Sequence, residues 1–149
     1  MTSRLSGALG VAGLLFVSSL GAQTSQTYSQ PREHAQGPVS YISGGVSEDE
    51  AQAMRAASAN YPLTLELAAP SGGPKDEYIA GAKVDILDRQ GNPVLNTTIE
   101  GPFLLVRLPA GTYTVAVAWN GAVKSKTVAI DGDKRQHVML EFPREHGPQ

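Results

Sequence analysis

The sequence predicts an all-β protein, a seven-stranded antiparallel β-sandwich preceded by a short N-terminal helix. Three observations predict this fold. Apolar and polar residues alternate from residue 61 onward, which is the period of half-buried strands. Turn-forming sequences interrupt the alternation at short, regular intervals. Gly (16) and Pro (10) are frequent among the 149 residues without reaching low complexity, as expected of a turn-rich β protein.

The seven predicted strands follow from this alternation and from the turns between its segments. The clearest strand is 112–119, in which Tyr113, Val115 and Val117 share one face with Trp119. Asn120-Gly121 then predicts a hairpin. The expected strands cover residues 63–67, 82–87, 94–99, 103–108, 112–119, 123–130 and 138–142.

The first 22 residues have the pattern of a secretory signal peptide. Arg4 precedes an apolar segment, 5–20, and the small residues Gly21 and Ala22 offer a cleavage site. The segment is too short and too interrupted by glycine for a bilayer span, which needs about 20 apolar residues. An uncleaved anchor is the alternative. We therefore expect a periplasmic or secreted protein with no stable membrane span after cleavage.

Three further segments flank the predicted sandwich, which occupies residues 61–142. Residues 23–40 are polar and lack an apolar period, so we expect a disordered linker. Residues 41–60 form a predicted arm with a glycine hinge and a short helix, 48–59. Ser47 and Glu50 have the spacing of a capping box at the start of that helix. The polar tail, 143–149, is expected to fray.

Composition excludes or disfavours several kinds of site. The chain has no Cys, which excludes disulfides and thiolate chemistry. Its net charge is −2 and it has no basic block, so we expect no nucleic-acid partner. No serine lies in a nucleophile-elbow sequence, and the three histidines lack metal-site spacing, although His137, Met139 and His146 leave a soft-metal site as an alternative. We expect no enzyme activity, catalytic residue or cofactor.

A resemblance supports the fold prediction. The pattern is Ala82-x-Val84-x-Ile86-x-Asp88-x-x-Gly91, then Gly101-x-Phe103, then Leu108-Pro109-Ala110-Gly111-x-Tyr113-x-Val115-x-Val117. From Pro62 to Phe142 the chain resembles the carboxypeptidase regulatory-like family, whose sandwiches are transthyretin-like (prealbumin-like) and related to carbohydrate-binding-like folds.

The resemblance carries expectations about function as well as fold. The chain also resembles small exported bacterial proteins that carry this module alone. The resemblance implies a non-catalytic role, as a spacer, a stabilising neighbour or an adhesion surface. Transthyretin-like hydroxyisourate hydrolases end in Tyr-Arg-Gly-Ser, whereas this chain ends at residues 145–149 in Glu-His-Gly-Pro-Gln. A hydrolase is therefore the least favoured alternative.

Several predicted strands are apolar on both faces, so one sheet needs a cover. Leu87, Phe103, Leu105 and Met139 fall on the faces that a two-sheet sandwich turns to water. The arm can fold back over them, because its short separation from the sheet in sequence keeps the closure cost small. Alternatively, the face or the arm binds a partner. The arm would contribute Tyr41, Ile42 and Met54.

The sequence therefore predicts an exported, non-enzymatic accessory or binding module that mediates protein interaction or envelope association. Its partner, a protein or a glycan of the cell envelope, is not identified by the residues. The alternative is a module that binds a small ligand, either carbohydrate or metal. Tyr78 and Trp119 are the aromatic residues best placed by sequence to contact a glycan.

Overall fold

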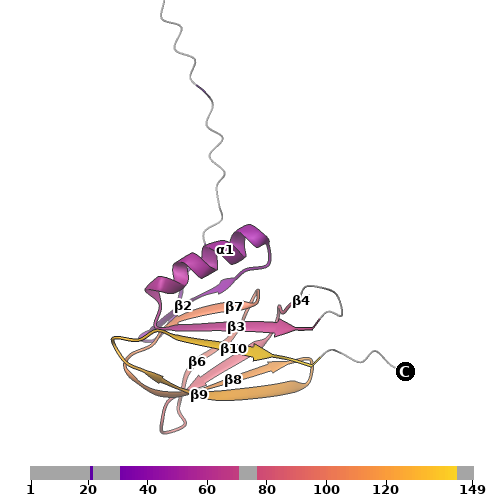
Figure 1. Ribbon diagram of the computed structural model, residues 1–149. Coiled ribbons are helices and arrows are strands. Elements are labelled where there is room, and N and C mark those ends of the chain that lie inside the picture. Colours follow the sequence, from indigo (N-terminus) through magenta and orange to yellow (C-terminus); the bar gives the residue numbers. More distant parts are fainter. Residues whose placement is uncertain (1–20, 22–30, 71–76, 144–149) are drawn as a thin grey trace, which may run out of the picture.

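The computed structural model describes residues 21, 31–70 and 77–143, and these residues form two β-sheets and one short α-helix (Figure 1). The predicted leader, apart from residue 21, and tail residues 144–149 lie outside the described residues. The elements in chain order are β1 (His34–Gln36), β2 (Val39–Gly44), α1 (Glu48–Ala57), the 3-10 turn η1 (Ser58–Asn60), β3 (Leu63–Ala69), β4 (Glu77–Tyr78), β5 (Lys83–Leu87), β6 (Pro93–Thr98), β7 (Phe103–Arg107), β8 (Gly111–Trp119), β9 (Ala122–Ile130) and β10 (Gln136–Glu141).

The strands divide between a six-stranded and a four-stranded sheet. The larger, here called sheet A, has the order β1-β2-β7-β3-β10, with β4 also pairing with β3. The smaller, sheet B, has the order β6-β5-β8-β9. Each of the seven predicted ranges overlaps a described strand, but the predicted count of seven is too low, because β1, β2 and β4 are further strands.

The expectation of purely antiparallel pairing is wrong at one place. Strand β10 pairs with β3 in parallel, with Val138 opposite Leu65 and Leu140 opposite Leu67. The strand before β10 is β9, which belongs to sheet B. No hairpin therefore fixes the direction of β10 relative to its neighbour.

A single cluster of buried side chains joins the facing sides of the two sheets. Sheet A contributes the alternating leucines of β3, and sheet B contributes the alternating valines of β8. Five central members, Leu65, Leu104, Val84, Ile86 and Val115, are each 0% exposed. The period of two therefore identifies the buried side of these strands.

The predictions for residues 31–44 need correction. Residues 34–36 and 39–40, expected in a disordered linker, belong to β1 and β2, and residues 41–44 of the predicted arm continue β2. Gly37, at φ 55°, allows the tight turn between the two strands. Val39 and Tyr41 are the residues of β2 whose side chains join the cluster between the sheets. Two alternating apolar residues in a polar segment are too few to predict a strand.

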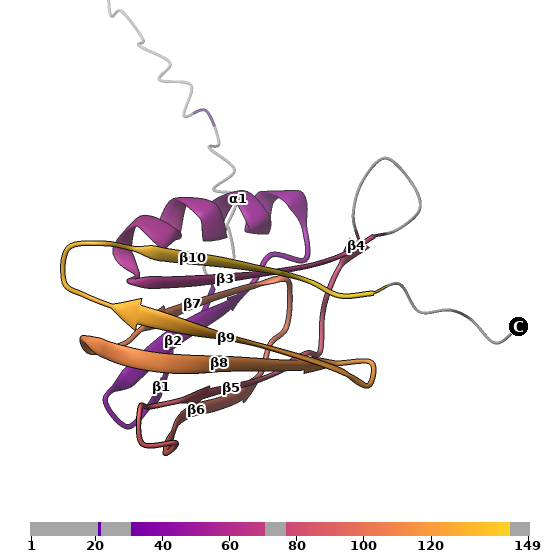
Figure 2. The same cartoon turned by 60° about the horizontal axis from the view of Figure 1, so that its bottom comes forward.

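The helix begins where the sequence predicts. Ser47 caps it, because its Oγ accepts a hydrogen bond from the Glu50 backbone N–H at 3.2 Å, and the Glu50 carboxylate accepts one from the Val46 N–H at 3.1 Å. Helix α1 ends at Ala57, slightly before the predicted end, and continues as η1. Figures 1 and 2 show α1 on one side of sheet A and sheet B on the other.

Two contacts connect the sheets where β1 approaches β6. The Gln36 side-chain amide donates to the Asn96 carbonyl at 2.7 Å and accepts from the Asn96 backbone N–H at 3.1 Å. The hydroxyls of Tyr41 and Thr97 are 3.2 Å apart. The Gln36 side chain thereby hydrogen-bonds the backbone N–H and carbonyl of Asn96 on β6, the edge strand of sheet B, in the way that a neighbouring strand would.

Two other residues hold tight loops in place. A Cβ at Gly101 would collide with the backbone of Gly44, so only glycine fits there without displacement. The Tyr113 hydroxyl donates to the Pro109 carbonyl at 2.8 Å. Burial, together with the negative charge of Asp88, raises the pKa of Tyr113 above its ordinary value.

Candidate functional site

Helix α1 covers part of the outer face of sheet A. Ile42, Phe103 and Leu105 project from β2 and β7 and form one buried cluster with Met54 of the helix, and the other members of that cluster are Ala51 and Tyr61. Phe103 is 1% exposed and Leu105 and Met54 are 0% exposed. The arm therefore covers these apolar side chains within the same chain, which was one of the two alternatives drawn from the sequence.

The remaining residues of the predicted face do not join this cluster. Tyr41 lies one residue from Ile42 on β2 and points to the opposite side, into the cluster between the sheets. Leu87 belongs to β5 of sheet B. Met139, on β10, is 52% exposed. The predicted face is thus divided among a covered cluster, the inter-sheet core and two separate surfaces.

Two open grooves flank α1 on the outer side of sheet A. The larger is about 920 Å³, and one ion pair lies along it. Arg107 forms an ion pair with Glu33 at 3.4 Å and lies 4.5 Å from the centroid of the Tyr61 ring. The Tyr61 hydroxyl also donates to Glu33, at 3.3 Å. Asp49 and Glu50 line the same groove, which gives it an acidic character.

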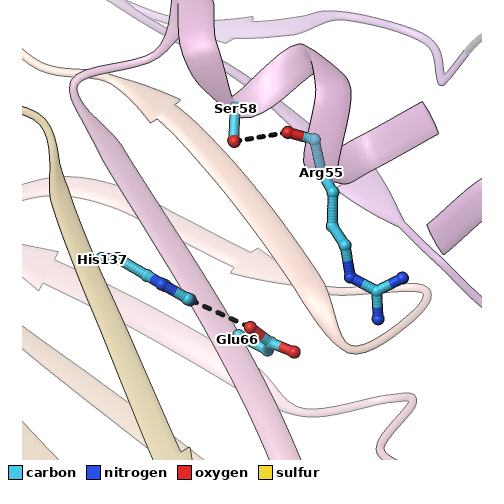
Figure 3. Close-up of polar contacts among 4 residues, drawn as sticks. All are labelled: Arg55, Ser58, Glu66 and His137. Atoms are coloured by element: carbon cyan, nitrogen blue, oxygen red, sulfur yellow. Dashed lines mark hydrogen bonds and ion pairs between the residues drawn. The ribbon is translucent and has the colours of Figure 1, made fainter. Parts of the chain in front are cut away.

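The smaller groove, here called the β10 groove, is about 350 Å³ and lies between the end of the helical segment and strands β3 and β10. Figure 3 shows the contacts of His137 with Glu66 and of Ser58 with Arg55 in this groove. His137 Nε2 and Glu66 Oε2 are 2.9 Å apart, which joins the two parallel strands. The Ser58 hydroxyl donates to the Arg55 carbonyl at 2.6 Å. The lining residues are Arg55, Ser58, Thr64, Glu66, Phe103, Arg135, Gln136 and His137.

Two arginines of this groove are fixed by neighbouring groups. The Arg55 guanidinium lies over the Phe103 ring, 5.3 Å from its centroid. Arg135 donates from Nη1 to the carbonyl oxygen of Ala59 at 3.0 Å. Both contacts hold the guanidinium in place without an opposite charge.

The sequence prediction missed most of this site. It considered His137 and Met139 as soft-metal ligands, but it did not single out Arg55, Arg135 or Glu66. Strand alternation does place Glu66 and His137 on outward faces. Their contact depends on the parallel register of β3 and β10, for which no local pattern exists.

The β10 groove holds a serine, a histidine and a carboxylate in a different arrangement from a hydrolase triad. In such a triad the histidine accepts the serine proton, but the Ser58 hydroxyl donates to a backbone carbonyl and His137 Nε2 contacts Glu66. Within residues 31–70 and 77–143, no three His, Asp or Glu side chains gather as a metal site would require.

The structure describes the side chain of only one of the two residues predicted to contact a glycan. Trp119 is partly buried, packs edge-on against Phe142 with ring centroids 5.9 Å apart, and lines a shallow pocket of about 280 Å³ with Lys83 and Asn120. Tyr78 belongs to β4, and its side chain lies outside the described part of the structure. Only Trp119 is therefore placed at a surface depression.

No protein-family model matches the chain, and no curated protein matches it either.

The part of the chain that the structure describes contains no helix with the length and apolarity needed to cross a membrane.

Proposed function

We propose that this chain is an exported, non-enzymatic binding module of the periplasm or extracellular space. On this proposal the two sheets form a prealbumin-like sandwich of the carboxypeptidase regulatory-like kind. The module contacts a protein partner of the cell envelope through the outer side of sheet A. The support for the fold comes from the resemblance between Pro62 and Phe142 and from the shared cluster between the sheets.

One observation carries the proposed contact surface: the outward side chains of β10 are exposed. Helix α1 packs against β2 and β7, whereas His137, Met139 and Glu141 of β10 are exposed. Met139 leaves about half of its side chain exposed there, beside the β10 groove. Met139 and the charged groups of the β10 groove together offer an apolar and a polar contact to a partner.

Site-specific photo-crosslinking in the producing cell tests this function. A photoreactive amino acid at position Met139 should give one discrete adduct in the envelope fraction. The matched control is position Ala129, which is exposed on β9 of sheet B and should give no such adduct. Equal labelling from both positions, or none from either, would contradict the proposed surface.

Carbohydrate binding is the second candidate, and the pocket beside Trp119 favours it. Its lining joins an indole ring to Lys83 and Asn120, which can donate hydrogen bonds to hydroxyls. A glycan array followed by titration tests it, because a bound sugar stabilises the native state by mass action. Lys83→Ala should weaken binding, whereas Lys126→Ala on β9 should not. No array signal would remove this candidate.

A further inference from the structure

The β10 groove carries positive charge in an acidic protein. The whole chain has a net charge of −2, yet Arg55, Arg135 and His137 line this groove with a single acid, Glu66. The Glu66 carboxylate is already hydrogen-bonded to His137. The groove therefore holds two permanent positive charges, on Arg55 and Arg135, against one carboxylate.

Neither guanidinium is neutralised within the described residues. The arginine that forms an ion pair there is Arg107, with Glu33, and Glu66 is hydrogen-bonded to His137. Arg55 makes its contact through the face of its guanidinium, on the Phe103 ring, so its N–H edges stay free of that contact. Arg135 donates a hydrogen bond from one nitrogen, Nη1, to the Ala59 carbonyl. A guanidinium has five N–H donors, so both arginines keep donors for an acceptor in the groove.

We propose that the β10 groove binds carboxylate side chains of an acidic segment on the protein partner. This inference rests on the proposed function and names the chemistry of its partner. Arginine forks match carboxylates with two parallel hydrogen bonds, which makes this anion the natural acceptor.

The shape of the groove favours a protein segment over a free anion. Its volume of about 350 Å³ lies near the lower end for ligand sites and leaves room for one or two side chains. Exposed Met139 follows His137 by two residues on β10, so an apolar surface lies next to the charges. A peptide can use both surfaces, whereas inorganic phosphate uses only the charges.

Nearby acids limit the strength of this attraction. The turn between β9 and β10 carries Asp131 and Asp133 together with Lys134, and Asp131 accepts the backbone N–H groups of the other two. The positive charge is thus confined to the groove. Binding should therefore be sensitive to salt and should depend on the two arginines more than on overall charge.

Fluorescence anisotropy with the full mature chain tests the proposal. The probe is a labelled peptide of alternating Glu and Gly, compared with the same peptide carrying Gln in place of Glu. The test variant is R55Q/R135Q. The matched control, R89Q/K126Q, removes the same charge from two exposed positions, in the β5–β6 turn and on β9. Thermal unfolding of each variant verifies that it folds.

The expected result is binding of the Glu peptide alone, weakened about tenfold by R55Q/R135Q and less than about twofold by R89Q/K126Q. Equal weakening by both double variants would overturn the proposal, since it would show only general attraction. Displacement of the peptide by inorganic phosphate at equal charge would assign the groove to free anions instead.

The outcomes also separate this inference from the proposed function. If the Glu peptide does not bind but position 139 still gives its crosslinked adduct, the carboxylate inference fails and the contact surface stands. If the adduct is also absent, the proposed function fails with it.

Discussion

Met54→Ala should destabilise the protein strongly, because Met54 is the helix side chain that fills the cluster on the outer side of sheet A. Its side chain is 0% exposed. Removing a buried methionine loses transfer free energy and leaves a cavity, together about 3 kcal/mol. The higher helix propensity of Ala offsets only a few tenths of this. At roughly 4 °C per kcal/mol, the melting temperature should fall by roughly 12 °C.

Met139→Ala is the matched control, because it makes the same chemical change at a side chain that is 52% exposed. It should change the unfolding free energy by less than about 0.5 kcal/mol. Both variants are measured by urea unfolding, followed by circular dichroism. Equal effects of the two substitutions would refute the packing of α1 on sheet A.

A double-mutant cycle adds a test of where Met54 packs. Leu105→Ala removes a member of the same cluster from the sheet side. Residues that share one cavity are coupled, so the double variant should deviate from additivity by about 1 kcal/mol. Strict additivity would place the two side chains in separate environments.

Three further predictions concern the loops and the edge of the sheets. Gly101→Ala should cost about 2 kcal/mol or more by overpacking against the neighbouring backbone, whereas Gly132→Ala, where a Cβ meets nothing within 4 Å, should stay within about 0.5 kcal/mol in urea unfolding. Gln36→Ala should lower the free energy of unfolding by about 1–2 kcal/mol, because it removes both amide hydrogen bonds to Asn96 of β6, whereas the exposed control Gln90→Ala should not. Equal urea midpoints for the two variants would show that the Gln36 hydrogen bonds do not stabilise the protein. The pKa of Tyr113 is raised in the folded protein, so the unfolded chain loses the phenol proton more readily. The contribution of Tyr113 to the free energy of unfolding is therefore fully present below pH 10 and is lost as the pH rises through the native pKa. Tyr113→Phe should flatten this alkaline loss in a pH series of thermal unfolding, and an unchanged pH profile would show that another group causes it.

Most of the strand positions could be predicted because the evidence for them is local. In β8 the alternation of Tyr113, Val115 and Val117 identifies both the strand and its buried face. The capping pattern at Ser47 and Glu50 likewise fixed the start of α1. Each pattern needs only neighbouring residues, since side-chain direction repeats every two residues in a strand and a cap acts within one turn.

Strands β1 and β2 were missed for a physical reason. β1 is an edge strand of three residues, and only Val39 and Tyr41 of β2 face the core. Their stability comes from pairing with β7 and from the Gln36 contacts to a strand about 60 residues away in sequence. Such long-range contacts leave no periodic pattern in the segment itself.

By itself the sequence determined the strand ranges, the helix start and the need to cover apolar residues such as Phe103 and Leu105. Tertiary structure alone decided that β10 pairs in parallel with β3, and this pairing brings Glu66 to His137 beside the arginines of the β10 groove. The reason is that alternation specifies the face of each side chain, whereas register and neighbours are selected by packing over the whole chain.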